Sequence, residues 1–397
     1  MRLVAEGSWL KADLWRSRVD AVRSRLAMAS QSLNPLLAGA RRILIIRPSA
    51  LGDVCRSVPV LASLRAALPA ARIDWLVQDS FVDGVLAHPM LDGVLPLPRS
   101  RLRRWATPAG ALDSLRWLST LARGRYDIVV DAQGLLRSAC FGLATRAPVR
   151  VGYSNAPEGA WLLYTHASRV ALERHSVDRM CALLAPLGVP PVLDTRLYAP
   201  RGAWERVRQT LGLEHAERYV VLAPTSRWPG KRWRIERFGE VASALLNSGS
   251  VARVVVVGAG SGGERSQCAP IFDASSRDAR VIDGVGRTSV GELMALIEHS
   301  ALVIANDSAA LHMGVGFDRP IVALYGPTDT ARVGPWQRES SVIQHVTPSD
   351  RLDHKDEPLG RALMDRISVQ EVIDRAMTSL QPANSANAAA GLPVMAP

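Results

Sequence analysis

The sequence predicts an α/β protein with two Rossmann-like, doubly wound domains. It contains 397 residues, 48% of them hydrophobic, which is more than one ordinary hydrophobic core requires. Short apolar runs alternate with amphipathic stretches, as in parallel sheets whose strands are joined by helices. Prolines and glycines interrupt this alternation at residues 186–203, after which it starts again. We therefore expect one domain over residues 41–200 and a second over residues 201–380.

Each predicted domain has its own set of short buried strands. In the first, they are expected at residues 42–48, 72–78, 93–98 and 126–134. Helical stretches such as residues 56–68 should lie between them. In the second, strands are expected in "YVVLAPT", "RVVVVGAG", "ARVIDGVG", "ALVIANDS" and "PIVALYGP". Ligands bind at the carboxyl ends of such strands, so the loops that follow them should line one central cleft that both domains face.

The chain carries a formal net charge of +11 at pH 7, and nearly all of its basic residues are arginine. This charge favours an anionic partner such as a nucleic acid, a phosphorylated lipid or a nucleotide. No nucleic-acid-binding motif accompanies it, and the arginines are spread along the chain, so we expect no nucleic acid partner. An arginine-rich proteome would explain the same charge.

The sequence contains no apolar run near the ~18 residues that cross a bilayer. Its first residues also lack the apolar core of a secretory signal, so a cytoplasmic protein is expected. The cysteines are scattered without a C-x-x-C pair, which predicts neither disulfides nor a zinc site. We expect them to be small buried side chains: Cys55, Cys140, Cys181 and Cys268.

A glycine-rich stretch in the second domain resembles a dinucleotide-binding fingerprint. Gly258, Gly260 and Gly263 satisfy G-x-G-x-x-G after a predicted strand, and Asp283 lies 20 residues farther on. The fingerprint normally follows the first strand of its domain, whereas this stretch follows the second. We interpret the glycines as a tight turn close to a nucleotide, and we expect no nicotinamide or other cofactor.

Three stretches with a characteristic order and spacing carry a family resemblance. They are "RPSALGDVCRSVPVL" (47–61), "APTSRWPGKRW" (223–233) and residues 286–329, which include "NDSAALHM". Together with "YDIVVDAQGLLRSA" and "HSVDRM", they resemble glycosyltransferase family 9, the bacterial heptosyltransferases, over about residues 41–380. The resemblance implies a GT-B fold, an acceptor on the first domain and a nucleotide sugar on the second. It also implies inverting transfer of heptose from ADP-heptose to the anionic Kdo/heptose inner core of lipopolysaccharide.

Asp53 is the predicted general base. Inverting transfer needs a group that takes the proton of the acceptor hydroxyl, and Asp53 follows Gly52 in a turn after the first predicted strand. From the residues alone, an aspartate that caps a helix beginning near Val54 is an equally good interpretation. The resemblance favours the base. Arg56 departs from the family pattern and, if it lies close, would favour the ionised carboxylate.

The donor diphosphate is expected to bind the second domain without a metal ion, because no D-x-D pair occupies a suitable loop. Thr225 and Ser226 at a strand end, and Lys231 beyond a Pro-Gly turn, are placed to hold phosphate. A surface lysine is the alternative for Lys231. Ala309 replaces the family's usual glycine, and His312 could be a core histidine instead of a ligand. The resemblance adds the donor residues Glu264, Thr288, Asp307, Ser308 and His312.

The segment "PRSRLRRWATP" (98–108) supplies clustered arginines for the predicted acceptor site. Arginine forks suit carboxylates and phosphates, and the segment resembles the family's basic acceptor-binding loop. A solvated basic loop is a nearly equal alternative. The candidates are Arg101, Arg103 and Arg104, to which the resemblance adds Ser49, Gln133, Arg137 and Arg179.

The two ends of the chain, residues 1–40 and 381–397, lie outside the resemblance. In the first, apolar residues share one helical face with arginines elsewhere, which would suit an anionic membrane surface. These residues are Trp15, Val19, Val22 and Leu26. A helix packed on the protein or a disordered arm is equally compatible. The low-complexity tail predicts disorder. With an anionic glycolipid as acceptor, the expected location is the inner face of the inner membrane.

Overall fold

The computed structural model describes residues 35, 37, 39–102, 107–260, 263–274 and 278–381. They form two compact units. The first comprises the described part of residues 1–204 with residues 290–295 and 329–336, and the second comprises the described remainder. The predictions on the N-terminal extension before residue 35, on Arg103 and Arg104, and on the tail beyond residue 381 lie outside the described residues.

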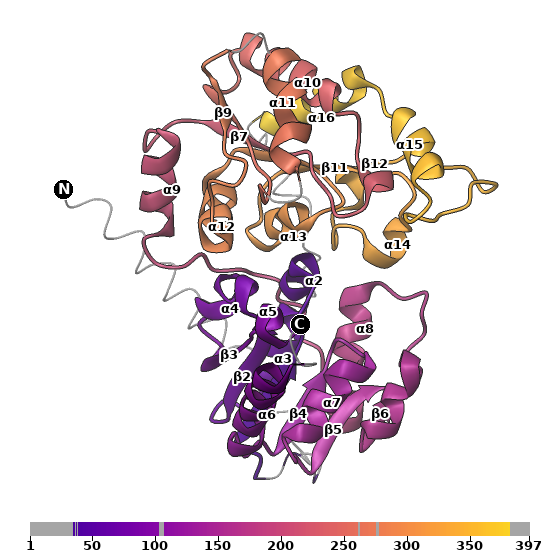
Figure 1. The fold of residues 1–397 in the computed structure, drawn as a ribbon. Helices are drawn as coiled ribbons and strands as arrows, with labels where there is room; N and C mark the ends of the chain where they lie inside the picture. Colours follow the sequence, from indigo (N-terminus) through magenta and orange to yellow (C-terminus); the bar gives the residue numbers. More distant parts are fainter. Residues whose placement is uncertain are drawn as a thin grey trace, which may run out of the picture. The chain divides into compact units, whose positions relative to one another are not determined.

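The first unit contains a six-stranded parallel sheet in the order β3-β2-β1-β4-β5-β6 (Figure 1). The strand order reverses beside the central β1, which is the doubly wound arrangement. Its strands are β1 (Arg42–Ile46), β2 (Arg72–Gln78), β3 (Gly93–Leu97), β4 (Ile128–Asp131), β5 (Val149–Tyr153) and β6 (His166–Ser168). The bounds predicted for β2 are confirmed, β1, β3 and β4 are shorter than predicted, and β5 and β6 were not predicted.

Helices connect these strands. They are α2 (Leu51–Arg56), α3 (Val58–Ala67), η1 (Asp79–Phe81), α4 (Asp83–Leu86), α5 (Arg99–Leu102), α6 (Pro108–Arg123), α7 (Leu136–Ala144), η2 (Pro157–Leu163), α8 (Ser176–Ala182) and η3 (Ala185–Leu187). The helical stretch predicted at residues 56–68 is present as α3, which begins two residues later and ends one residue earlier, and a break at Ser57 separates it from α2. Pro59 explains the break, since proline has no N–H for a helical hydrogen bond and is tolerated in a first turn.

The core of the first unit lies where α6 and α7 pack on the sheet. It contains the buried side chains of Leu44, Leu97 and Phe141, with Trp117 packed against them. The rings of Trp117 and Phe141 meet edge to face with centroids 5.1 Å apart. Alternate residues of each strand face these helices, so the apolar runs recognised in the sequence become this core.

The second unit repeats the strand order of the first, as β12-β11-β10-β7-β8-β9, again all parallel. Its strands are β7 (Tyr219–Ala223), β8 (Arg253–Val256), β9 (Val281–Asp283), β10 (Leu302–Asn306), β11 (Ile321–Leu324) and β12 (Val342–Ile343). Taken from its β9 edge, this order is β9-β8-β7-β10-β11-β12, so β7 corresponds to β1 and β10 corresponds to β4. Both sheets confirm the predicted fold class, two Rossmann-like, doubly wound α/β parts.

The helices after residue 200 are α9 (Ala203–Leu211), η4 (Pro229–Lys231), α10 (Ile235–Asn247), α11 (Glu264–Ala274), α12 (Val290–His299), α13 (Ala309–Gly316), α14 (Thr330–Val333), η5 (Glu339–Ser341), α15 (Glu357–Asp365) and α16 (Val369–Leu380). The core of the second unit includes Trp233 and Phe238, whose rings meet edge to face. The indole N–H of Trp233 donates to the Ile367 carbonyl at 3.1 Å. This buried anchor fixes the segment that leaves η4.

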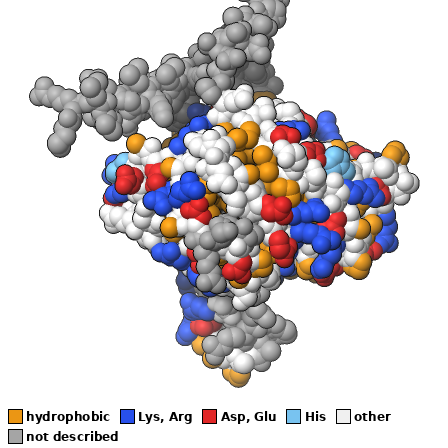
Figure 2. Space-filling view, turned by 90° about the horizontal axis from the view of Figure 1, so that it is seen from above, with side chains coloured by type: hydrophobic (Ala, Val, Ile, Leu, Met, Phe, Trp, Pro, Cys, Tyr) orange, Lys and Arg blue, Asp and Glu red, His pale blue; other side chains and the backbone are white. Residues whose placement is uncertain are grey.

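The described residues contain no helix with both the length and the apolarity needed to span a membrane. Figure 2 shows basic and acidic side chains interspersed over one face of the molecule, with hydrophobic side chains between them. Three of the cysteines are buried as predicted, but Cys140 is exposed on α7. It occupies the outward side of that helix, whereas Phe141 beside it is buried.

Candidate active site

The turn after β1 holds Asp53 between two arginines. Arg47, which follows the last residue of β1, places Nη2 2.8 Å from Asp53 Oδ2. Arg56, one turn farther along α2, pairs its Nη2 with Asp53 Oδ1. The Asp53 side chain keeps 27% of its surface exposed, whereas both arginines are almost covered. The carboxylate is therefore fixed from both sides and still open to solvent. Arg56 therefore lies close enough to favour the ionised carboxylate.

Asp53 also takes part in capping α2, although differently from the prediction. The helix begins at Leu51, so a helix beginning near Val54 is wrong, and Asp53 lies inside the first turn. Its Oδ2 accepts a hydrogen bond at 3.3 Å from the backbone N–H of Ala50, the residue before the helix. This is the returning half of a capping box. Capping and exposure coexist in one side chain, so the cap does not exclude a base.

A buried carboxylate at the end of β4 organises the neighbouring loop. Asp131 accepts hydrogen bonds from the hydroxyls of Ser138 at 2.7 Å and Tyr164 at 2.8 Å, and from the N–H groups of Gln133 and Gly134. Burial raises the pKa of Asp131, and these hydrogen bonds oppose that rise. The fixed loop directs the Gln133 side chain, whose oxygen accepts from the N–H of Ser49 at 3.2 Å. Two predicted acceptor residues, Ser49 and Gln133, therefore meet beside the Asp53 turn.

Three arginines near this turn each keep one guanidinium nitrogen without a hydrogen-bond partner among the described residues. The buried Nε atoms of Arg47, Arg56 and Arg179 are in this state. Arg179, on α8, lies over the Tyr153 ring at 5.6 Å from its centroid. Arg56 also donates to the Ser176 hydroxyl on α8 at 2.8 Å. Together the three guanidinium groups make this strand edge positively charged, which is suited to an anion.

The remaining described acceptor candidates lie farther along the same edge of the sheet. Arg137, in the first turn of α7, is exposed and lines a pocket. Arg101 is two-thirds exposed and lies 3.5 Å from Asp113 of α6, an ion pair on the surface. Such pairs contribute little, so nothing in this geometry separates Arg101 from the solvated loop that remained open.

In the second unit, Lys231 and Asp307 meet at the ends of β7 and β10. Lys231 Nζ lies 2.5 Å from Asp307 Oδ2, and both side chains are nearly covered, with 14% and 10% of their surfaces exposed. The Thr328 hydroxyl donates to the same oxygen at 3.0 Å, and the Ser226 hydroxyl donates to the Asp307 carbonyl at 3.1 Å. Lys231 is therefore not a freely solvated surface lysine, although its role as a phosphate ligand stays a prediction.

A buried asparagine fixes this arrangement. Asn306, the last residue of β10, donates from its amide to the Pro224 carbonyl at 2.6 Å and accepts from the Trp233 N–H at 3.2 Å. Its two hydrogen bonds connect the loop after β7 to the end of β10. Gly230 is packed tightly, because a Cβ there would lie only 3.2 Å from the backbone carbonyl oxygens of His354 and Asp356. Lys231 is thus positioned by packing on both sides.

The start of α13 contains an unsatisfied hydroxyl. Ser308 occupies the N-cap, yet its side chain makes no capping hydrogen bond, and its buried Oγ has no partner among the described residues. Ala309 begins the helix and His312 is buried in its second turn. A helix N-terminus with free N–H groups and a spare hydroxyl is suited to a phosphate. The role of His312 stays open between donor contact and core packing.

The glycine-rich turn after β8 serves backbone packing. Gly260, at a φ of +71°, lies so close to Gly286 that a Cβ would come within 2.5 Å of its Cα. Asp283 is engaged by Arg265 Nη1 at 2.5 Å and the Val285 N–H at 3.0 Å. Both observations agree with a tight turn.

Two predicted donor residues border this turn, and a third follows β9. Glu264, the first residue of α11, accepts from the Ala259 N–H at 2.7 Å. A Cβ on Gly258 would lie 3.0 Å from the Glu264 carboxylate and 3.4 Å from Thr225, so these side chains surround one point of the backbone. Thr288 is half-buried in the loop before α12. The predicted donor residues of the second unit thus follow the carboxyl ends of β7, β8, β9 and β10.

Sequence reasoning missed Arg47, Asp131 and Thr328. Each stands within a few residues of a strand end inside a stretch that had been recognised, but the fold brings its partner to it: Asp53 for Arg47, Tyr164 for Asp131 and Asp307 for Thr328. A polar residue at the end of an apolar strand is the signal that could have identified Arg47 and Asp131. Within the described ranges, no group of three or more His, Cys, Asp or Glu side chains is placed to hold a metal ion.

The two doubly wound α/β units have the topology of GT-B glycosyltransferases. The family model "Glycosyltransferase family 9 (heptosyltransferase)" matches residues 115–359. The chain belongs to this family, and it is a glycosyltransferase.

Curated relatives agree with the family. The chain is 27% identical over 324 residues to lipopolysaccharide heptosyltransferase 1 of Salmonella typhimurium, a match that covers 79% of this chain and 97% of the relative. It is 28% identical over 303 residues to lipopolysaccharide heptosyltransferase 1 of Pseudomonas aeruginosa, covering 75% and 82%.

Solved structures agree with the fold. The structure of E. coli ADP-heptose lps heptosyltransferase II is similar with a TM-score of 0.70 at 22% identity, covering 85% of this chain and 98% of that chain. E. coli heptosyltransferase WaaC with ADP is similar with a TM-score of 0.66 at 23% identity, covering 85% and 99%.

Proposed function

We propose that this glycosyltransferase transfers heptose from ADP-heptose to the anionic Kdo/heptose inner core of lipopolysaccharide, with inversion and with Asp53 as general base. The relatives named above are lipopolysaccharide heptosyltransferases, and one similar structure contains ADP. The observation that carries the catalytic proposal is the Asp53 carboxylate, fixed by two arginines and still partly exposed. We assign the acceptor to residues 41–200 and the nucleotide sugar to residues 201–380.

In the proposed reaction, Asp53 accepts the proton of the acceptor hydroxyl as that oxygen attacks the anomeric carbon of the heptose. The bond to the diphosphate breaks on the opposite face of the sugar. Arg47 and Arg56 favour the ionised carboxylate, which is the form that can accept a proton. They also fix its direction, so that less rotational freedom is lost in reaching the transition state.

The leaving ADP needs positive charge and hydrogen-bond donors. Lys231 offers an ammonium group near the first turn of α13, where the free Ser308 hydroxyl and backbone N–H groups are available. In this proposal the diphosphate draws Lys231 partly away from Asp307, and the Thr328 hydroxyl continues to satisfy that carboxylate. These groups stabilise the developing negative charge without a metal ion.

The acceptor is anionic in this proposal, and the clustered guanidinium groups of Arg47, Arg56 and Arg179 support that assignment. Their positive charge and their donors suit a carboxylate. The reaction would take place at the cytoplasmic face of the inner membrane, as a peripheral association, because the proposed acceptor is a membrane glycolipid.

The test is a turnover assay with the purified full chain, ADP-heptose and a Kdo-bearing lipid A acceptor. Release of ADP together with a heptosylated product would support the proposal. Tight binding of ADP-heptose without turnover would instead indicate a nucleotide-sugar-binding protein. Turnover only with another nucleotide sugar or another acceptor would retain the enzyme class and refute the substrates.

A further inference from the structure

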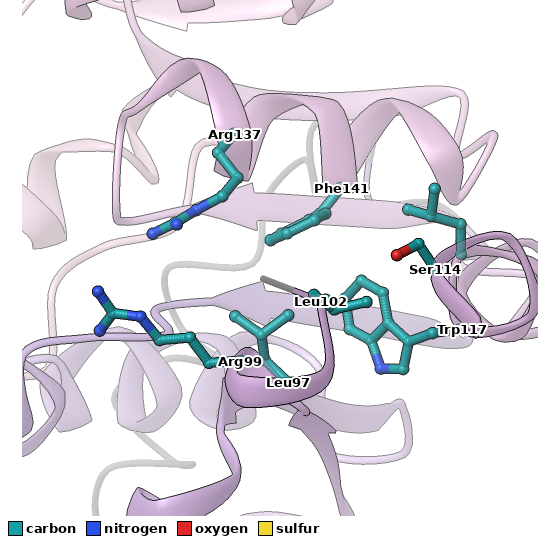
Figure 3. A pocket seen from close by; sticks show the side chains of 8 residues that line it. Leu97, Arg99, Leu102, Ser114, Trp117, Arg137 and Phe141 are labelled. Carbon is teal, nitrogen blue, oxygen red and sulfur yellow. The ribbon is translucent and has the colours of Figure 1, made fainter. Parts of the chain in front are cut away.

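A pocket of about 540 Å³ opens between α5, α6 and α7 in the first unit (Figure 3). Its volume lies within the range of roughly 300 to 1,000 Å³ that is usual for small-molecule sites. Most of its lining is apolar, and the rest is one hydroxyl and two arginines. The lining residues are Leu97, Arg99, Leu102, Ser114, Trp117, Leu118, Arg137 and Phe141.

The two ends of the pocket differ in chemistry. Figure 3 shows the guanidinium groups of Arg99 and Arg137 at one end, while Trp117 and Phe141 lie toward the other. The apolar end is rigid, because the Trp117 indole N–H donates to the Pro96 carbonyl at 3.0 Å and its ring packs edge to face on Phe141. The pocket is therefore amphipathic, with an apolar interior and a cationic mouth.

The cationic mouth belongs to the same sheet edge as the Asp53 turn. Arg99 Nη1 donates to the Gln78 side chain at 3.1 Å, and the Gln78 N–H donates to the carbonyl of Pro48 at 3.1 Å. On the other side, Arg137 follows the loop of Gln133, whose side chain holds the Ser49 N–H. Hydrogen bonds through Gln78 thus link Arg99 to Pro48, and the chain between Gln133 and Arg137 links the other side of the mouth to Ser49.

We propose that this pocket binds a hydrocarbon chain of the lipid acceptor, with Arg99 and Arg137 holding an anionic group of the same molecule at its mouth. The inference rests on the proposed function for the acceptor's identity. The preference for an anionic amphiphile follows from the pocket itself, because an apolar cavity favours methylene groups and paired guanidinium groups favour phosphate or carboxylate. An acceptor hydroxyl at Asp53 and an acyl chain in the pocket would then occupy one continuous edge.

A chain-length series tests the pocket directly. Calorimetry of the full chain with butyl, hexyl and octyl phosphate should show affinity rising by about fourfold per methylene, the value expected for complete burial. Inorganic phosphate should bind more weakly than any of them. Arg137→Gln should weaken the whole series by about tenfold, as for a lost charged hydrogen bond. Affinity that does not depend on chain length would overturn the proposal.

Two serines of α6 provide matched variants. Ser114 lines the pocket and donates to the Gly110 carbonyl, whereas Ser119 does not line it and donates to the Arg116 carbonyl. Ser114→Phe should remove the dependence on chain length, and Ser119→Phe should preserve it. Leu118→Gln is a second pocket variant that adds no volume, and it should reduce the gain per methylene. Equal behaviour of all three variants and the wild type would contradict the proposal.

Kinetics separate this inference from the proposed function. With an active enzyme, Ser114→Phe should raise KM for the acylated acceptor and leave KM for the deacylated acceptor unchanged. If heptose transfer fails with both acceptors while the alkyl phosphates still bind with chain-length dependence, the proposed function is wrong and the pocket stands. If transfer is normal, KM is equal for both acceptors and alkyl phosphates show no such dependence, the pocket proposal is wrong and the function stands.

Discussion

The two units have the same strand order but carry different chemistry at corresponding strand ends. After β1, a carboxylate is held by two guanidinium groups that retain unpartnered nitrogens. After β7, the corresponding strand, an ammonium group is held by one carboxylate, with hydroxyls around it. After β1, the Asp53 carboxylate can accept a proton, and the guanidinium groups beside it suit a planar anion such as a carboxylate. After β7, the Lys231 ammonium is a compact positive charge that suits a phosphate. The shared sheet positions the loops, and their side chains select the ligand.

The fourth strand along the chain in each unit also ends in a buried polar residue. β4 ends at Asp131 and β10 ends at Asn306, and both side chains are buried. Asp131 only accepts hydrogen bonds, from two N–H groups and two hydroxyls, whereas Asn306 both donates to a carbonyl and accepts from an N–H. The last residue of the fourth strand thus fixes a loop in both units. In the first unit the loop supplies only hydrogen-bond donors, and in the second it supplies one donor and one acceptor.

The largest expected effect is a loss of turnover when Asp53, in the turn after β1, is replaced. Asp53→Asn keeps the shape and a cap for the Ala50 N–H, but it cannot accept a proton. We expect turnover to fall by ~10²-fold or more, the usual scale for a lost general base, with ADP affinity and folding near wild type. Asp113→Asn, on the surface, is the control. Normal turnover in Asp53→Asn would reduce Asp53 to a cap.

The next largest expected effect is weaker binding of ADP when Lys231, in the loop after β7, is replaced. Lys231→Ala should weaken ADP by about 1.5 to 3 kcal/mol, as measured by calorimetry, because a charged hydrogen bond is lost. Lys355→Ala removes an exposed lysine from the same unit and should leave the affinity unchanged. Should both variants bind ADP equally well, Lys231 would have only the structural role of pairing with Asp307.

Replacing Asn306 by aspartate and Asp131 by asparagine should lower the free energy of unfolding moderately and by unequal amounts. Asn306→Asp replaces the donor to the Pro224 carbonyl by an acceptor and should destabilise the fold by about 1 to 3 kcal/mol in urea unfolding. Asp131→Asn should cost less, because the Ser138 and Tyr164 hydroxyls can rotate to accept from the new amide. A larger loss in Asp131→Asn would mean that the two loops are not fixed in the same way.

The smallest expected effect is a loss of stability of the first unit at mildly acidic pH, caused by His88. Burial lowers the pKa of His88 to about 4, whereas the unfolded value is near 6.5. The unfolded state therefore binds more protons between these values, and stability falls as pH decreases through this window. Going from pH 8 to pH 6 should cost about 1 kcal/mol, with further loss toward pH 4. His88→Gln should flatten this dependence, and a variant with an unchanged pH profile would contradict the assignment.

Strands and turns whose conformation depends on neighbouring residues could be predicted from short stretches of the sequence. Apolar runs gave the positions of β1 and β2 because a strand buried on both faces needs a nearly continuous apolar sequence. The run "GVLPL" gave β3 as well, although this edge strand is only partly buried. β5 and β6 were missed because "VRVGY" mixes polar with apolar residues and "HAS" is only three residues long. Pro59 in the first turn of α3 is the local signal for the break between α2 and α3.

The sequence by itself determined the doubly wound class, the turn that carries Asp53 and the loop that carries Lys231, since these follow from apolar periodicity and from motifs of adjacent residues. Only the tertiary structure decided the pairings. Asp307 lies 76 positions from Lys231, and Gln133 lies 84 positions from Ser49. Such pairs form because parallel strands bring their carboxyl ends to one edge of the sheet, and the order of those strands is set by packing over the whole unit.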